Sequence, residues 1–116
     1  MPSATSDRLE PFDVVVVPFP FSEKEGSKRR PALVLSTAPL NSSGHIVMAM
    51  ITTRSHHPWP GDLPIHDLEA AGLPSLCMVR LKLFTLDNRL IIRRLGRLSD
   101  DDIARMRTVL DTYLAT

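Results

Sequence analysis

The chain has 116 residues, 43% of them apolar, and its 14 Lys and Arg against 13 Asp and Glu leave a net charge of +1. This length allows one domain and no second, since single cores span roughly 100 to 150 residues. The near balance of charge excludes the overall basic field of a strongly basic nucleic-acid binder, so any polyanion site must be a local cluster of cations. The single cysteine, Cys77, excludes an intramolecular disulfide and Cys-rich zinc sites.

The sequence predicts a short lead, one domain and a cytoplasmic location. Residues 1–11 offer nothing to bury, so we expect a flexible N-terminal lead before a single domain over 12–116. No apolar run approaches the roughly 20 residues that a membrane-spanning helix needs. The N-terminus also lacks the apolar centre of a secretion signal. With one cysteine, a reducing cytoplasm is the expected compartment, without membrane contact.

Short apolar segments predict strands in the first half of the chain. Residues 14–17 and 32–35 are rich in β-branched side chains, too short for helices and bounded by proline, which indicates strands buried on both faces. The polar loop 22–28 joins them into a hairpin. After a predicted turn at 41–44, residues 45–51 predict a third strand.

The second half predicts two more strands. Residues 77–83 alternate as a half-buried strand does, with Val79, Leu81 and Leu83 on one face and Arg80 and Lys82 on the other. A turn is expected at 87–88, and residues 90–92 are expected to begin a fifth strand.

The end of the chain changes to a helical period. Ser99 can cap a helix that runs to about Leu114, with three aspartates in its first turn, where negative charge meets the positive end of the helix dipole. One face of this helix is apolar: Ile103, Met106, Val109, Leu110, Tyr113 and Leu114. Five or more short strands and a terminal helix predict a mainly β fold, a small and strongly bent barrel.

Residues 13–36 resemble the opening of PemK/MazF-family toxins, the ribonuclease partners of type II toxin–antitoxin pairs. The segment reads Asp-Val-Val-Val-Val-Pro-Phe-Pro-Phe, and then Gly-Ser-Lys-Arg-Arg-Pro-Ala-Leu-Val-Leu-Ser. The resemblance continues through 46–53, which ends in Ile-Thr, through 59–62 and through 79–87. Two departures stand out: Phe12 occupies a position where many members carry Gly, and the acid that several relatives carry two residues after the arginine is missing after Arg80.

The resemblance implies an SH3-like β-barrel of the PemK/CcdB type and a homodimer with an RNA groove along the subunit interface. It also implies a toxin that arrests growth when its cognate antitoxin is lost. Its activity would be sequence-selective cleavage of single-stranded mRNA without metal or other cofactor, leaving 2′,3′-cyclic phosphate and 5′-hydroxyl ends. Two alternatives are a non-enzymatic toxin of the CcdB type that binds DNA gyrase, and a degenerate toxin that binds antitoxin or RNA without cleavage.

Three residues are the candidate catalytic groups. RNA cleavage without a metal needs proton removal from the 2′-hydroxyl, a cation for the charge building on the phosphate, and protonation of the departing 5′-oxygen. Arg30 is the expected cation, since the resemblance makes its Arg-Pro step the family's most recognisable catalytic position. Thr52, in the matching Ile-Thr pair, can donate to a phosphate oxygen or orient the nucleophile. Arg80 can point with Lys82 into a groove.

The general base is left open by the missing acid. The candidates are His56, His57, Asp62, Ser22 and Glu23. RNA contacts are expected from a set of polar residues and one aromatic: Lys28, Arg29, Thr53, Arg54, His56, His57, Trp59 and Lys82. Trp59 can stack on a nucleobase, a contact worth about 1 to 3 kcal/mol, or cap the open end of the barrel.

Two further groups of residues carry polar or charged side chains. The first matches no established zinc spacing, so we expect no metal site among its members, His45, His56, His57, His66, Asp62 and Asp67. The second can meet phosphate or an acidic antitoxin tail, or form a solvated strand face: Arg89, Arg93, Arg94 and Arg97.

Overall fold

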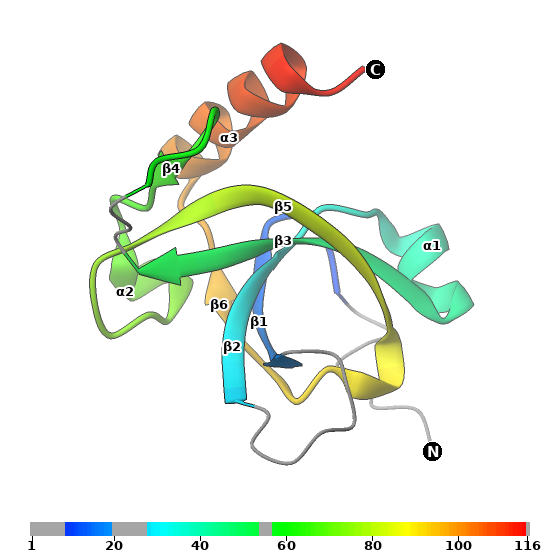
Figure 1. Cartoon of the computed structure of the whole chain (residues 1–116). Helices are drawn as coiled ribbons and strands as arrows, with labels where there is room; N and C mark the ends of the chain where they lie inside the picture. The colour runs from blue at the N-terminus through cyan, green and yellow to red at the C-terminus, as the bar shows by residue number, and fades with distance from the viewer. Residues whose placement is uncertain (1–8, 20–27, 54–56, 116) are drawn as a thin grey trace.

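A computed structural model describes residues 9–19, 28–53 and 57–115 (Figure 1). Within this part of the chain, six strands form one antiparallel sheet in the order β4-β5-β3-β2-β1-β6. The strands are β1 Asp13–Phe19, β2 Lys28–Val34, β3 His45–Thr53, β4 Leu63–Pro64, β5 Cys77–Asp87 and β6 Arg93–Arg97. The helices are α1 Ala38–Ser43, α2 Leu68–Ala71, the 3₁₀ turn η2 Asn88–Leu90, and α3 Asp100–Tyr113. The expected mainly β fold with a C-terminal helix is confirmed.

The central strands are buried on both faces, as predicted. Alternate residues of β1, β2 and β3 enter two separate apolar clusters. The first cluster takes Val14, Leu33, Ala49 and Ile51, and α3 joins it through Ile103 and Met106. The second takes Val15, Val17, Ala32, Val34, Ile46 and Met48. The sheet curls so that β5 arches across β3, while α3 lies beside β4 at one end of the molecule (Figure 1).

The terminal helix begins where the sequence predicts. Ser99 accepts a hydrogen bond from the Asp102 backbone N–H and caps α3, with three aspartates in the first turn. Its apolar face is buried only over the first turns, because Tyr113 and Leu114 at the far end are exposed. No helix among the described residues is both long and apolar enough to span a bilayer.

Two predicted elements were wrong. The turn expected at 41–44 is the end of α1, which has a proline in its first turn and stops at Gly44 in the left-handed conformation (φ +116°). Residues 90–92 do not start a strand, because Asp87 accepts a hydrogen bond from the Arg89 N–H and caps η2. The ladder with β1 therefore begins at β6, directly after the Ile92 N–H, which donates to the Val16 carbonyl at 2.9 Å. The elements β4 and α2 are too short to leave a periodic signal.

A bulge in β5 interrupts its pairing with β3 without changing which residues share a face. Ala49 of β3 pairs with Leu83, whereas the next residue, Met50, pairs with Arg80, so Leu81 and Lys82 are extra. Bulges bend a strand and increase its twist. As the alternation predicts, Val79 and Leu81 pack with the first cluster while Arg80 and Lys82 line one cavity. Leu83, on the same face as Val79, is 39% exposed.

The N-terminal lead is partly packed. Of residues 1–11, the structure describes only 9–11, and Leu9 is 1% exposed inside the second cluster. The expectation that this segment has nothing to bury missed this side chain. Arg97 fixes the neighbouring backbone by donating to the Pro11 carbonyl at 3.0 Å.

Phe12 is the one non-glycine residue with a positive φ (+75°) in the described part of the chain. Its N–H donates to the Val34 carbonyl at 2.7 Å and its carbonyl accepts from Leu98 N–H at 3.0 Å, so the backbone is held on both sides. The ring is buried, with the Arg107 guanidinium 5.0 Å from its centroid. The glycine that many relatives carry here is thus explained by the left-handed backbone. Here a buried aromatic ring offsets the strain.

Substitution at Phe12 should reverse the usual ranking of alanine and glycine. Both changes lose the buried ring, at a cost of about 3 kcal/mol or more. Alanine keeps a Cβ in the left-handed region, at about 1 kcal/mol, so Phe12→Gly should be at least as stable as Phe12→Ala in urea unfolding. Leu98, buried without a positive φ, is the control: Leu98→Gly should be less stable than Leu98→Ala. The same ranking at both positions would contradict the strain at Phe12.

Asp102 ties α3 to the segment between β4 and α2. Its fully buried carboxylate accepts from the backbone N–H of His66 at 3.1 Å and of Asp67 at 3.0 Å, and from the Arg105 guanidinium. Burial raises the pKa of Asp102, but the hydrogen bonds from Asp67, Arg105 and His66 outweigh it, so the net pKa lies below 3.8. The charged form therefore stabilises the folded state.

The contribution of Asp102 should vanish in acid. Because its pKa is lower folded than unfolded, its stabilisation is present above about pH 4 and is lost as pH falls through the folded value. Asp102→Asn should lower the free energy of unfolding by about 2 kcal/mol at pH 7 and by clearly less at pH 2.5, measured by urea titration. Asp111→Asn, on the exposed face of the same helix, is the control and should change little. An equal loss from Asp102→Asn at both pH values would refute this role.

Candidate active site

Strand alternation places the three candidate catalytic residues on one face of the sheet. Arg30 lies two residues before Ala32 and pairs with Val17, both in the second cluster. Thr52 lies two residues after Met50, and Met50 pairs with Arg80 across β3 and β5. Since paired residues and i, i+2 neighbours share a face, all three side chains extend from the rim of the second cluster.

These residues meet in a cavity of about 190 Å³. Its described lining joins polar groups from β2, β3 and β5 to apolar side chains: Phe19, Arg30, Met50, Ile51, Thr52, Trp59, Arg80 and Lys82. The cavity thus combines three cations, one hydroxyl and one tryptophan, and no acid or histidine is among these lining residues. Lys82 Nζ lies 5.6 Å from the Phe19 ring centroid. The arrangement suits a ligand that carries both negative charge and a flat ring.

Arg80 is fixed by Asp62 and His57, which lie outside the cavity lining, and by Trp59, which is part of it. Its Nε and Nη2 donate to the two carboxylate oxygens of Asp62 at 3.1 and 2.9 Å, and Nη2 also donates to the His57 carbonyl at 3.2 Å. Its guanidinium carbon lies 5.0 Å from the centroid of the Trp59 ring.

Asp62 is unsuited to the role of general base. Burial raises the pKa of Asp62, but hydrogen bonds from Arg80 and from the Trp59 N–H, with the attraction of the Arg80 charge, bring it below its usual value. The pKa of Arg80 is raised, first by its hydrogen bonds to Asp62. Of the other base candidates, His57 contributes its backbone carbonyl to Arg80, while Ser22, Glu23 and His56 lie outside the described residues.

The remaining predicted RNA-binding residues are spread over β2 and the end of β3. Thr53 lines an adjoining cavity of about 170 Å³ together with Arg30, Thr52 and Cys77. Burial raises the pKa of the Cys77 thiol. Lys28 is exposed at the start of β2, and Arg54 lies outside the described residues.

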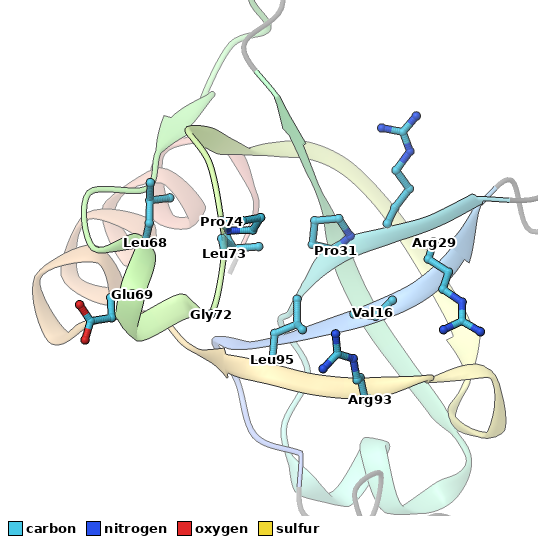
Figure 2. A pocket seen from close by; sticks show the side chains of 11 residues that line it. Val16, Arg29, Pro31, Leu68, Glu69, Gly72, Leu73, Pro74, Arg93 and Leu95 are labelled. Carbon is cyan, nitrogen blue, oxygen red and sulfur yellow. The ribbon is translucent and has the colours of Figure 1, made fainter.

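Arg29 faces a different cavity on the opposite side of the sheet. This space, of about 560 Å³, is lined mainly by apolar residues, with Arg29 and Arg93 near Val16 and Glu69 across from them (Figure 2). Arg30 and Pro31 also border it. The structure therefore does not bring Arg29 together with Thr52 and Arg80.

Three of the four late arginines are held by acids. Arg94 and Arg97 approach the buried Asp13 carboxylate at 3.4 Å, and Arg89 pairs with Asp87 at 2.8 Å. Hydrogen bonds from Arg89 lower the pKa of Asp87 to about 2. Arg93 borders the cavity of about 560 Å³ beside Arg29.

One histidine–carboxylate group is close enough to hold a metal in the described part of the chain: His66, Asp101 and Asp102. The Asp102 carboxylate already binds Arg105 and two backbone N–H groups, which gives it a structural role. Asp67 caps α2 by accepting from the Ala70 N–H at 3.0 Å. These contacts give Asp102 and Asp67 structural roles.

Fold and cavity together define a small curled β protein with a cationic site suited to a phosphate-bearing ligand. Residues 10–114 match the sequence model of PemK-like, MazF-like toxins of type II toxin–antitoxin systems, and the chain belongs to this family. No match was found among curated proteins.

Solved structures of this fold are similar over nearly their whole length. The MazE–MazF complex of Deinococcus radiodurans (Form-III) has a TM-score of 0.67 and 28% identity, covering 91% of this chain and 95% of that one. MazF of the same organism (Form-I) has a TM-score of 0.68 and 26% identity, covering 93% and 97%. A mycobacterial endoribonuclease in complex with its cognate antitoxin has a TM-score of 0.67 and covers 90% of each chain. At 18% identity, this last likeness concerns the fold alone.

Proposed function

We propose that this toxin is a sequence-selective endoribonuclease that cleaves single-stranded mRNA without a metal ion. It leaves a 2′,3′-cyclic phosphate and a 5′-hydroxyl, and it acts as a homodimer in the cytoplasm. The observation that carries the proposal is the single cavity in which Arg30, Thr52, Arg80, Lys82 and Trp59 converge. The family membership supports the same activity.

The cavity supplies electrostatic stabilisation of the reacting phosphate. Arg30 and Arg80 place two guanidinium groups where negative charge builds as the 2′-oxygen attacks phosphorus, and such preorganised donors contribute most in the transition state. Thr52 donates from a strand, so its β-branched side chain is restricted in χ1. No described lining residue is an acid or histidine, and Asp62 is bound to Arg80. A phosphate oxygen flanked by these cations is therefore our candidate for receiving the 2′-hydroxyl proton.

RNA recognition follows from the cavity rim. Trp59 is partly exposed beside Arg80 and offers a face for a nucleobase. Unstacked bases of single-stranded RNA can occupy such a face, whereas paired bases cannot. Lys28 and Thr53 extend the polar rim along β2 and β3, and we keep Arg29, Arg54, His56 and His57 as predicted contacts.

The partner is a cognate antitoxin, as in the complexes named among the structural neighbours. A segment that is acidic and partly apolar would complement the three cations and the exposed tryptophan of the cavity. Such a segment folds as it binds and would occupy the place of RNA.

Removal of Arg30 or Thr52 should abolish most cleavage. Losing a contact made in the transition state costs about 3 kcal/mol, roughly a hundredfold in rate. Arg30→Ala and Thr52→Ala should therefore lose at least that much activity on a long single-stranded RNA while remaining folded. Cleavage by the wild-type protein should be unaffected by EDTA. Arg89→Ala, which removes an exposed arginine outside the cavity, is the matched control and should cleave normally. Full cleavage by folded Arg30→Ala would sink the assignment.

If wild-type protein leaves the RNA intact, the alternatives of a gyrase-binding or a degenerate toxin apply. End analysis of the fragments tests the chemistry separately: 3′-phosphate without a cyclic form at any time would exclude 2′-hydroxyl attack. EDTA-sensitive activity restored by a divalent cation would exclude the metal-independent mechanism.

Trp59, the chain's single tryptophan, should report ligand binding directly. Adding 2′-O-methyl RNA, which cannot be cleaved, should change the intrinsic fluorescence, and saturating antitoxin should displace the RNA. The RNA affinity should fall steeply as salt rises from 50 to 200 mM, because phosphate contacts release counterions. The antitoxin complex, which also buries apolar surface, should weaken less. RNA that stays bound at saturating antitoxin would show that the two use different surfaces.

A further inference from the structure

We propose that Asp62 is a positioning residue, which holds the Arg80 guanidinium in the orientation that meets the RNA phosphate. The proposal rests on the proposed function and concerns a residue outside the lining of the cavity. Its basis is the two-point contact between Asp62 and Arg80, made by a turn that is itself fixed on both sides.

Asp62 holds the Arg80 guanidinium at two points. Nε and Nη2 of Arg80 donate to separate oxygens of one carboxylate, and the two side chains are only 12% and 11% exposed. Two parallel charge-assisted bonds fix the plane of a guanidinium as well as its position. The His57 carbonyl takes a further Nη2 hydrogen and the Trp59 ring lies against the guanidinium. In the part of the chain the structure describes, Nη1 has no hydrogen-bond partner, so it can donate to a ligand.

The turn that carries Asp62 is closed and docked. Trp59 N–H donates to Asp62 Oδ2 at 2.8 Å, and Asp62 N–H donates back to the Trp59 carbonyl at 3.2 Å. Gly61 within it has φ +81°, and a Cβ there would come 2.9 Å from Leu81 Cδ1 and 3.1 Å from the Tyr113 ring. The turn therefore packs closely against the β5 bulge and α3. Asp62 is fixed by these hydrogen bonds with the Trp59 backbone. Its carboxylate can therefore fix the Arg80 guanidinium.

The bulge explains why Arg80 needs such a partner. Arg80 is the last residue of β5 in register with β3 before the two extra residues, Leu81 and Lys82. Regular pairing with β3 before and after Arg80 would restrict its backbone in both directions along the strand. Here the regular pairing lies only before Arg80, because the bulge follows it. Without Asp62, the long side chain has several rotamers in which Nη1 leaves the cavity. Asp62 removes this freedom before RNA binds, which is where preorganisation raises the rate.

Steady-state cleavage by Asp62→Asn tests the proposal. A displacement of a positioned group by about 1 Å lowers the rate by up to about a hundredfold, so kcat should fall between about 10- and 100-fold while KM changes less. The acidic limb of the pH–rate profile should remain, because Asp62 transfers no proton. In an Arg80→Ala background, Asp62→Asn should have no further effect. Arg80→Lys, which keeps the charge and loses the fork, should lose activity similarly.

Asp87→Asn is the matched control. Asp87 makes the same two-point contact with an arginine, Arg89, but away from the cavity. This variant should cleave at the wild-type rate. Circular dichroism of every variant establishes that it is folded.

Three results would overturn the proposal: an Asp62→Asn rate equal to or above the wild-type rate, loss of the acidic limb, or a full additional loss in Arg80→Ala. The first result would mean that Asp62 does not affect the rate or that it competes with the RNA phosphate for Arg80. The second would mean that Asp62 is the general base. Failure of the proposed function is distinguishable, since wild-type protein would then leave RNA uncut. In that case, hydrogen exchange of the Arg80 Nε–H, followed by NMR, still tests the proposal. Slow exchange in the wild type that is equally slow in Asp62→Asn would show that Asp62 does not fix the guanidinium.

Discussion

Burial of the central sheet on both faces is the constraint from which the site follows. Because alternate residues of β1, β2 and β3 fill two apolar clusters, polar side chains are admitted only where a cluster ends. Arg30 and Thr52 stand one i, i+2 step beyond Ala32 and Met50, at that limit. The same alternation that builds the second cluster thus sets the direction of the catalytic candidates. A one-residue slip would turn them to the opposite face.

The contribution of β5 is of a different kind. Its bulge frees Arg80 from a regular ladder, so tertiary contacts with Asp62, His57 and Trp59 must orient the side chain. The resemblance led us to look for an acid within β5 itself. The structure provides an acid from a separate turn, 18 residues earlier in the chain. An acid bound in this way has a lowered pKa. It is therefore better suited to orienting Arg80 than to accepting a proton from the substrate.

The sequence predicted what depends on local pattern. The hairpin strands, the third strand, the capped C-terminal helix and the gathering of Arg30, Thr52 and Arg80 all follow from alternation, capping and the family motif. The bulge at Leu81 and Lys82 was missed, because their apolar–polar pattern is that of a regular strand. The contact between Asp62 and Arg80 was missed as well, since nothing near Asp62 in the sequence indicates Arg80. The glycine that the family resemblance leads one to expect at position 12 was a sign of a left-handed backbone. The phenylalanine in this chain does not itself indicate that conformation.

Although the net charge is only +1, the charges are distributed unevenly: most late arginines are paired with acids, whereas cations of the cavity are available to a ligand. Three of the four arginines of β6 and η2 are paired with acids of the same chain: Arg94 and Arg97 with Asp13, and Arg89 with Asp87. Among the described residues, Arg30 has no ion-pair partner, although it borders three cavities. An unpaired guanidinium in a partly enclosed site is costly to desolvate until an anion arrives, which increases the differential binding of a phosphate whose charge is growing. Arg80, braced by Asp62, contributes direction, while Arg30 contributes the uncompensated charge.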